Sequence, residues 1–296
     1  MNSLKLLSPA KVNLRLDVLG KRDDGYHEIR TVMQRIDICD ELEISLRRRG
    51  IDILSDSKDM PQNIENIAYH AAKSILDRFK IDVGVRIFIK KKIPIAAGLG
   101  GGSSNAATTL IGLNRLLKLG LTRKELIKMG TLLGADVPFF IFEKSALATG
   151  IGDRLQGIKL PSPIWMVLVN PKIQVSTSWA YKNLNLNIGL TKKKNNISIL
   201  PPVAQLSDVV DFLHNDLEHV TVKRYPEIQM IKEELIDKGA EGALMSGSGP
   251  SVFGIFSNRE RADKAFDQLR FTNRDYTLFL SSSFDNKNQG GVNGSN

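Results

Sequence analysis

Residues 94–105 read Pro94-Ile95-Ala96-Ala97-Gly98-Leu99-Gly100-Gly101-Gly102-Ser103-Ser104-Asn105, a run of small residues that contains four glycines. Apolar and polar residues alternate over residues 83–89, which predicts a strand before the loop, and apolar residues recur at helical spacing over residues 106–117. Glycine has no Cβ, so the amide groups of such a loop can approach a ligand closely, and the following helix adds its positive end. The serines offer hydroxyl groups to phosphate or to a phosphate-bound Mg²⁺ ion. We therefore predict that Pro94 to Ser104 bind the phosphates of a nucleotide; the alternative is a flexible turn with an ordinary helix cap.

Other well-known motifs do not fit the chain. The GxxxxGK[ST] phosphate loop does not occur, and the dinucleotide fingerprint fails because Ser103 stands at its third glycine position. The HRD and DFG motifs of protein kinases are missing as well. His27 and Glu28 begin like the zinc motif HExxH, but Thr31 replaces its second histidine. There is also no GxSxG elbow, so the sequence does not indicate zinc or serine hydrolase chemistry.

A second loop of small residues, Ser246-Gly247-Ser248-Gly249-Pro250-Ser251, lies between a short apolar stretch and the apolar residues 252–256. Glycine, proline and serine are the residues of tight turns, so one interpretation is a plain hairpin. A second glycine loop in the same chain also favours a shared site for a polyphosphate.

Three further places carry residues suited to catalysis or recognition. Asp136 stands among apolar residues beside a proline, where it is either a helix cap or a general base that accepts or orients a substrate hydroxyl. Lys11 alternates with apolar neighbours, so it either faces solvent from an edge strand or stabilises developing negative charge. Tyr26 and His27 follow the turn at residues 23–25 and can stack on and hydrogen-bond a base.

Length and charge narrow the class of protein. The chain has 296 residues and a formal net charge of +9, which suits an anionic partner. Its basic clusters are short and lack interleaved aromatic residues, so a phosphorylated small molecule is favoured over nucleic acid. No apolar run approaches the length of about 18 residues that a membrane span requires. The first ten residues do not resemble a signal peptide, so a cytoplasmic protein is expected, with its single cysteine, Cys39, in a structural role.

The pattern of elements restarts beyond Gly150, which predicts domains over residues 1–154 and 155–284 and a disordered tail over residues 285–296. The segment at 185–202 is rich in Asn and Lys and is predicted to be a surface loop. A helix is expected over residues 64–79 with Asn63 as its cap, and another begins at Thr122 with a capping box to Glu125. Further helices are expected over residues 176–184, 203–213 and 227–238. The expected strands are 42–46, 83–89, 164–169 and 242–245.

Taken together, residues 9–13, 94–107 and 246–251 resemble the three motifs of the GHMP kinase superfamily. The resemblance spans nearly the whole chain. It implies a two-domain α+β fold with a ribosomal-protein-S5-like N-terminal domain, a ferredoxin-like C-terminal domain and the site between them. Within the superfamily, Gly25-Tyr26-His27 and residues 135–139 are most similar to kinases that act on a cytidine diphosphate derivative of methylerythritol in the non-mevalonate isoprenoid pathway.

This resemblance implies transfer of the γ-phosphate of ATP, with Mg²⁺, to the 2-hydroxyl of the methylerythritol unit. By position, Lys11 and Asp136 match the catalytic pair, and Pro94 to Ser104 match the ATP loop, although Ala96 and Ala97 stand where glycine is more common. It does not imply a metal site of the protein's own. We expect a monomer or weak homodimer. The residues that match the substrate-binding positions are Asn13, Tyr26, His27 and, in a segment that matches less closely, Tyr181.

Two alternatives remain open at the level of sequence. A homoserine, mevalonate or sugar kinase of the same superfamily would share the lysine and glycine motifs. It would have no use for an aromatic stack at Tyr26, so alanine there should leave its substrate affinity nearly unchanged. A nucleic-acid-binding module would instead show strongly salt-dependent RNA binding and no ATP turnover.

Overall fold

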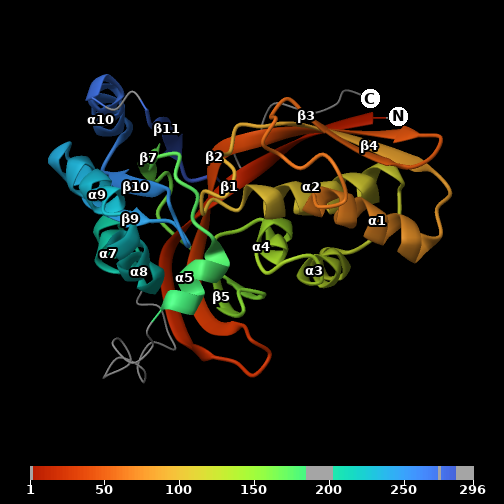
Figure 1. Cartoon of the computed structure of the whole chain (residues 1–296), viewed down its shortest axis with the longest axis horizontal. Coiled ribbons are helices and arrows are strands. Elements are labelled where there is room, and N and C mark those ends of the chain that lie inside the picture. The colour runs from red at the N-terminus through yellow and green to blue at the C-terminus, as the bar shows by residue number, and fades with distance from the viewer. Residues whose placement is uncertain (1–2, 185–202, 273–274, 285–296) are drawn as a thin grey trace.

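The computed structural model describes residues 3–184, 203–272 and 275–284, so the predicted tail and the whole predicted loop at 185–202 lie outside the described residues. The chain forms two sheets flanked by helices (Figure 1). The first sheet has seven strands in the order β3-β4-β2-β1-β8, with β5 on β2 and β6 on β5; the second has the order β11-β7-β10-β9. The predicted two-domain α+β fold is confirmed.

The first sheet is built on a long antiparallel hairpin of β1 (Ser3–Lys21) and β2 (His27–Arg47). The strand predicted at 42–46 is only the end of β2. The register shifts three times along the hairpin, between Pro9 and Ala10, between Asn13 and Arg15, and between Val18 and Gly20. The shifts after Asn13 and after Val18 each leave one extra residue in β1, and such a one-residue bulge moves the following side chains to the other face, which breaks the period of two in the sequence. The other strands are β3 (Ile51–Ser55), β4 (Gly84–Lys90), β5 (Ala146–Gly150) and β6 (Arg154–Gly157).

Helices α1 (Ile67–Phe79), α2 (Gly101–Leu116) and α4 (Val137–Phe142) pack on this sheet, and α3 (Arg123–Thr131) packs on α2 and α4. All four helices share one apolar cluster with the sheet. The predicted start of α1 is wrong by three residues. Asn66 caps the helix by accepting a hydrogen bond from the amide of Ala68, whereas Asn63 accepts one from Glu65 in the preceding turn. The predicted capping box at the start of α3 is confirmed.

The second sheet contains β7 (Trp165–Asn170), β9 (Gly242–Met245), β10 (Val252–Phe256) and β11 (Thr277–Ser282). Helices α5 (Thr177–Asn183) and α9 (Glu227–Asp237) lie within a residue of the predicted bounds, and α7 (Leu206–Asp211) is shorter than predicted. The strand β11 was not predicted from the sequence, and neither were a further short strand and two helices. These last three elements are β8 (His214–Asn215), α8 (Asp216–Arg224) and α10 (Arg259–Thr272).

The two sheets are joined by an apolar cluster that draws on both. Val12 and Ile36 of the first sheet pack in it with Leu168 and Phe253 of the second. The predicted domain boundary after residue 154 would cut β6, and β8 leaves the C-terminal half to pair with β1. A boundary near residue 158 fits the strands better, and we propose it in place of 154.

Two smaller expectations concern the membrane and the cysteine. Among the described residues, no helix is long and apolar enough to cross a membrane. Cys39 lies half-buried in β2, and burial, reinforced by the charge of Asp37, raises the pKa of its thiol to about 12. A thiol with so high a pKa is a poor nucleophile at neutral pH, in agreement with the predicted structural role.

Candidate active site

A cleft of about 930 Å³ gathers residues that are far apart in the sequence. It is bordered by β1, the start of β2, the glycine loop, the segment before α4, and α5. The predicted residues that line it are Lys11, Asn13, Tyr26, His27, Asp136 and Tyr181, together with 94–98 and 100–103 of the glycine loop.

Lys11 and Asp136 face each other in this cleft. Nζ of Lys11 lies 3.6 Å from Oδ2 of Asp136, and the lysine is only 4% exposed. The interpretation of Lys11 as a solvent-facing residue of an edge strand is therefore wrong. Asp136 stands at the cap position of α4, but its side chain makes no capping hydrogen bond and remains about one-third exposed. A carboxylate that is not used by the helix is available to a ligand in the cleft.

The ammonium group of Lys11 is held by two further acceptors. It donates hydrogen bonds to Oδ1 of Asn13 and to the carbonyl of Gly98, the latter at 3.2 Å. Asn13 in turn donates from Nδ2 to Oγ1 of Thr31 at 2.8 Å, and that hydroxyl donates to the carbonyl of Arg15. Asn13, predicted to bind substrate, thus also orients the lysine. Thr31 was not predicted, because a threonine inside a long strand carries no sequence signal of its own.

The two glycine loops pack against each other. Gly98 has φ +74°, and a Cβ there would lie 2.1 Å from the carbonyl oxygen of Ser246. The hydroxyl of Ser246 donates to the carbonyl of Gly98 at 3.0 Å and accepts from the amide of Asn13 at 3.3 Å. The second loop is therefore both the turn of the antiparallel hairpin of β9 and β10 and a part of the cleft, so the two interpretations of the sequence are compatible.

The glycine loop continues into α2, whose N-terminal turn borders the cleft. Gly100 has φ +70°, and a Cβ there would lie 2.9 Å from the ring of Phe140. Because the cap residue is a glycine without a side-chain hydrogen bond, the first amides of α2 stay available to an anion.

Ser103 lines the cleft, but two predicted residues of the loop do not. Ser104 is fully buried and accepts a hydrogen bond from Ser8, and Leu99 packs in the apolar cluster between the sheets.

Of the three consecutive lysines at residues 90–92, directly before the glycine loop, Lys91 lines the cleft. It forms a buried ion pair with Asp40, which also accepts hydrogen bonds from the amides of Lys92 and Ile93. Lys90 pairs on the surface with Glu41 instead. Asp40 therefore fixes the start of the glycine loop and holds the positive charge of Lys91 beside it.

Three aromatic residues, Tyr26, His27 and Tyr181, also line the cleft. The rings of His27 and Tyr181 stack with their centroids 4.9 Å apart and an angle of 27° between planes. Partial burial, together with the charge of Lys21, lowers the pKa of His27, which favours the neutral imidazole. Burial and the negative charge of Asp136 raise the pKa of the Tyr181 hydroxyl, which stays protonated. Tyr26 is 59% exposed at the rim.

Comparison with known proteins agrees with this arrangement. Residues 66–144 match the family model of the GHMP kinases N terminal domain, and residues 203–275 match that of the GHMP kinases C terminal. A 4-diphosphocytidyl-2-C-methyl-D-erythritol kinase from Geobacter sp. (strain M21) is 52% identical over 274 residues, which cover 92% of this chain and 96% of the relative.

Two solved structures extend the comparison. A crystal structure of 4-(cytidine 5'-diphospho)-2C-methyl-D-erythritol kinase matches with a TM-score of 0.76 and 31% identity, covering 94% of this chain and 98% of that one. L. major mevalonate kinase in complex with R-mevalonate matches with a TM-score of 0.74 and 15% identity, covering 96% of each chain, which shows a shared fold alone. On the identity and coverage of these relatives, the chain belongs to the GHMP kinase superfamily and, within it, to the family of the 4-diphosphocytidyl-2-C-methyl-D-erythritol kinases.

Proposed function

We propose that this chain transfers the γ-phosphate of ATP to the 2-hydroxyl of 4-diphosphocytidyl-2-C-methyl-D-erythritol, giving the 2-phosphate and ADP. The observation that carries the proposal is the pairing of Lys11 with Asp136, 3.6 Å apart, beside a glycine loop and in the same cleft as the His27–Tyr181 stack. The membership of the chain in this kinase family supports the same reaction.

In the proposed mechanism, Asp136 accepts a hydrogen bond from the 2-hydroxyl and takes its proton. The freed oxygen forms a bond to the γ-phosphorus as the bond to the bridging oxygen of ATP breaks, and ADP leaves with that electron pair. Lys11 donates to the oxygens on which negative charge develops, because Asn13 and the Gly98 carbonyl hold its ammonium group in place. Phosphoryl transfer depends mainly on such positioning and charge stabilisation.

Mg²⁺ is proposed to enter with the nucleotide. Among the described residues that line the cleft, Glu65 and Asp136 carry carboxylates, and Ser103 offers a hydroxyl at the start of α2. Mg²⁺ usually keeps several waters and binds through one or two carboxylates and phosphate oxygens. This donor set fits an ion carried largely by ATP. When bound, the ion neutralises charge on the β- and γ-phosphates.

Assembly and location remain proposals. For its assembly, we propose a monomer or a weak homodimer. We also propose that the protein works in the cytoplasm, and that its basic charge serves phosphorylated small molecules and not nucleic acid.

The proposal is tested by measuring ADP release from Mg-ATP with three acceptors in parallel: the cytidine compound, homoserine and mevalonate. Turnover with the cytidine compound alone is the expected result. Turnover with another alcohol would overturn the substrate but leave the kinase. Binding of RNA without any ATP turnover would favour the nucleic-acid alternative and overturn both.

The aromatic residues that line the cleft give a sharper test of the substrate. Alanine in place of Tyr26 is expected to weaken binding of the cytidine compound by about 1–3 kcal/mol, the value of one stacked base. The ring is 59% exposed, so its loss should hardly change the stability of the fold. Tyr26→Phe keeps the ring and is the matched control. Equal affinities of the wild type and the alanine variant, measured by calorimetry, would argue against stacking at this position.

A further inference from the structure

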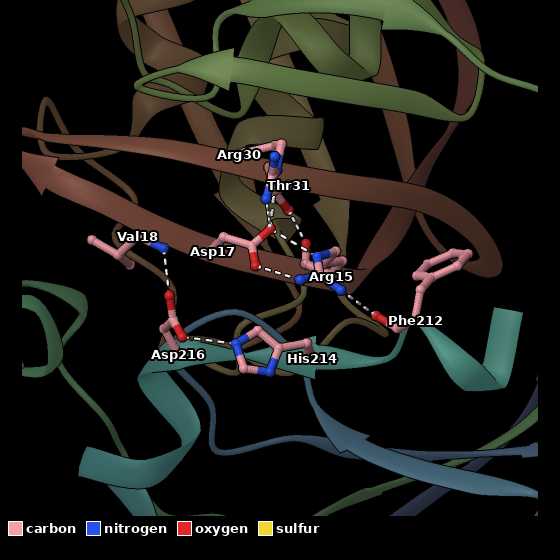
Figure 2. Close-up of polar contacts among 8 residues, drawn as sticks. All are labelled: Arg15, Asp17, Val18, Arg30, Thr31, Phe212, His214 and Asp216. Carbon is pink, nitrogen blue, oxygen red and sulfur yellow. Dashed lines mark hydrogen bonds and ion pairs between the residues drawn. The ribbon is translucent and has the colours of Figure 1, made fainter. Parts of the chain in front are cut away.

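Asp17, His214 and Asp216 form a cluster outside the cleft, with their potential ligand atoms within 4.8 Å of one another. The cluster is composed like a metal site, but its oxygens already have partners (Figure 2). Asp17 accepts hydrogen bonds from Arg15 at 2.7 and 2.8 Å and from Arg30 at 3.1 Å. Two guanidinium groups therefore neutralise this carboxylate, and the cluster is a network of ion pairs.

This network fastens a segment of the C-terminal half onto β1. Arg15 donates to the carbonyl of Phe212 at 3.2 Å, and Asp216 accepts from the amide of Val18 at 2.7 Å while it bonds His214 at 2.7 Å. Between these two anchors, β8 pairs in parallel with β1. Residues 212–216 are thus held at both ends against the strand that carries Lys11 (Figure 2).

Asn215 occupies the middle of the fastened segment and turns its side chain to the second glycine loop. The residue is 6% exposed. Its Nδ2 group donates to the carbonyls of Met245 at 2.8 Å and Gly247 at 2.7 Å, and its Oδ1 accepts from the amide of Leu217 at 3.0 Å to cap α8. The side-chain amide thereby connects α8 with the loop, while Asn215 pairs with Leu16 of β1 through the strand β8.

Gly247 is the part of the second loop that approaches the reacting groups. A Cβ on Gly247 would lie 3.5 Å from Nζ of Lys11, 3.3 Å from Oδ1 of Asn13 and 3.3 Å from the carbonyl oxygen of Gly98. Gly247 and Ser248 also line the cleft. A shift of this loop would change the space between the catalytic lysine and the nucleotide loop.

We propose that Asn215 is a positioning residue for phosphoryl transfer, which it supports by holding the carbonyls of Met245 and Gly247 so that the second loop keeps its place beside Lys11 and the nucleotide. The proposal rests on the proposed function. Asn215 does not line the cleft and acts only through the loop. Catalysis responds to displacements of about 1 Å in such supporting groups, with losses of about 100-fold.

Two variants separate the tasks of Asn215. Asn215→Ser keeps a side-chain oxygen that can cap α8 but is too short to bridge the two carbonyls. Asn215→Asp also keeps the capping oxygen and puts an acceptor where the donor stood. Asn114→Asp is the matched control. The side chain of Asn114 in α2 also donates a hydrogen bond to a backbone carbonyl and accepts one from a backbone amide, both of Leu121, and neither residue lines the cleft. Thermal unfolding shows which variants are folded at the assay temperature.

The measurements are kcat, the KM for the cytidine compound, and the Kd for a non-hydrolysable ATP analogue. Both Asn215 variants are expected to lose about 10- to 100-fold in kcat and about tenfold in affinity for the analogue, with the KM for the cytidine compound unchanged. A merely structural residue would lower the folded fraction and move neither binding constant. Unchanged kcat and Kd in a folded variant, or an equal rise of both binding constants, would overturn the proposal. The titration with the analogue does not depend on the acceptor, so it still tests Asn215 if the proposed substrate fails.

Discussion

Replacement of Asp136 by asparagine is expected to lower kcat by about 10²- to 10⁴-fold, the contribution of a positioned proton acceptor. Asparagine has the same shape and can still accept a hydrogen bond from the substrate hydroxyl, but it cannot take the proton. The KM values should change little, because the side chain makes no capping hydrogen bond whose loss would move α4. Single-turnover kinetics with Mg-ATP and the cytidine compound measure the effect on the chemical step.

The same variant separates the two roles that the sequence left open for Asp136. If the carboxylate only orients the hydroxyl, asparagine retains most of that function, and the loss should stay below about tenfold. Asp82→Asn is the control for a generic loss of negative charge, since Asp82 is exposed in the loop before β4. A comparable loss of activity in that variant would argue against a specific role for Asp136.

Replacement of Gly98 by alanine is expected to abolish detectable nucleotide binding and to destabilise the fold. The backbone there has φ +74°, where a Cβ costs about 1–2 kcal/mol. The new methyl group would also stand 2.1 Å from the carbonyl oxygen of Ser246, so the two glycine loops would have to separate. Calorimetric titration with the ATP analogue and thermal unfolding measure the two effects.

Gly120→Ala is a control that separates the effect of backbone strain from the effect of a steric clash. Gly120 has φ +70°, nearly the same backbone conformation, but a Cβ there would have no neighbour within 4 Å. This variant should lose only the 1–2 kcal/mol or so of conformational strain and bind the nucleotide normally. If Gly98→Ala behaved like Gly120→Ala, the close packing of the two loops would not matter for binding.

The site was predictable where its signal is local in the sequence. The glycine loop and its strand and helix depend on a continuous stretch of about thirty residues, and the capping box of Thr122 and Glu125 on four. Asp136 stands out because a charged residue is rare within an apolar run. Such patterns carry their own physical explanation, so no partner from elsewhere in the chain is needed to read them.

The features of the site that could not be predicted depend on contacts between residues that are far apart in the sequence. The burial of Lys11 follows from the register of β1 on β2, and the bulges at Pro9 and Asn13 hide that register from a period-of-two analysis. The role of Asn215 depends on a two-residue strand and on carbonyls thirty residues away. The burial of Leu99 and Ser104 is set by contacts with Ser8 and the inter-sheet cluster.

Because Ile36 of the first sheet packs with Leu168 and Phe253 of the second in one apolar cluster, either half of the chain on its own would leave its side of this cluster uncovered. A gene fragment that encodes one half would yield a polypeptide with an exposed apolar face, which would be prone to aggregate. For the same reason, the halves of two relatives cannot be recombined freely. A chimaera is expected to fold only when the side chains that the two parents place in this shared cluster match in volume. The two halves are therefore constrained to evolve together.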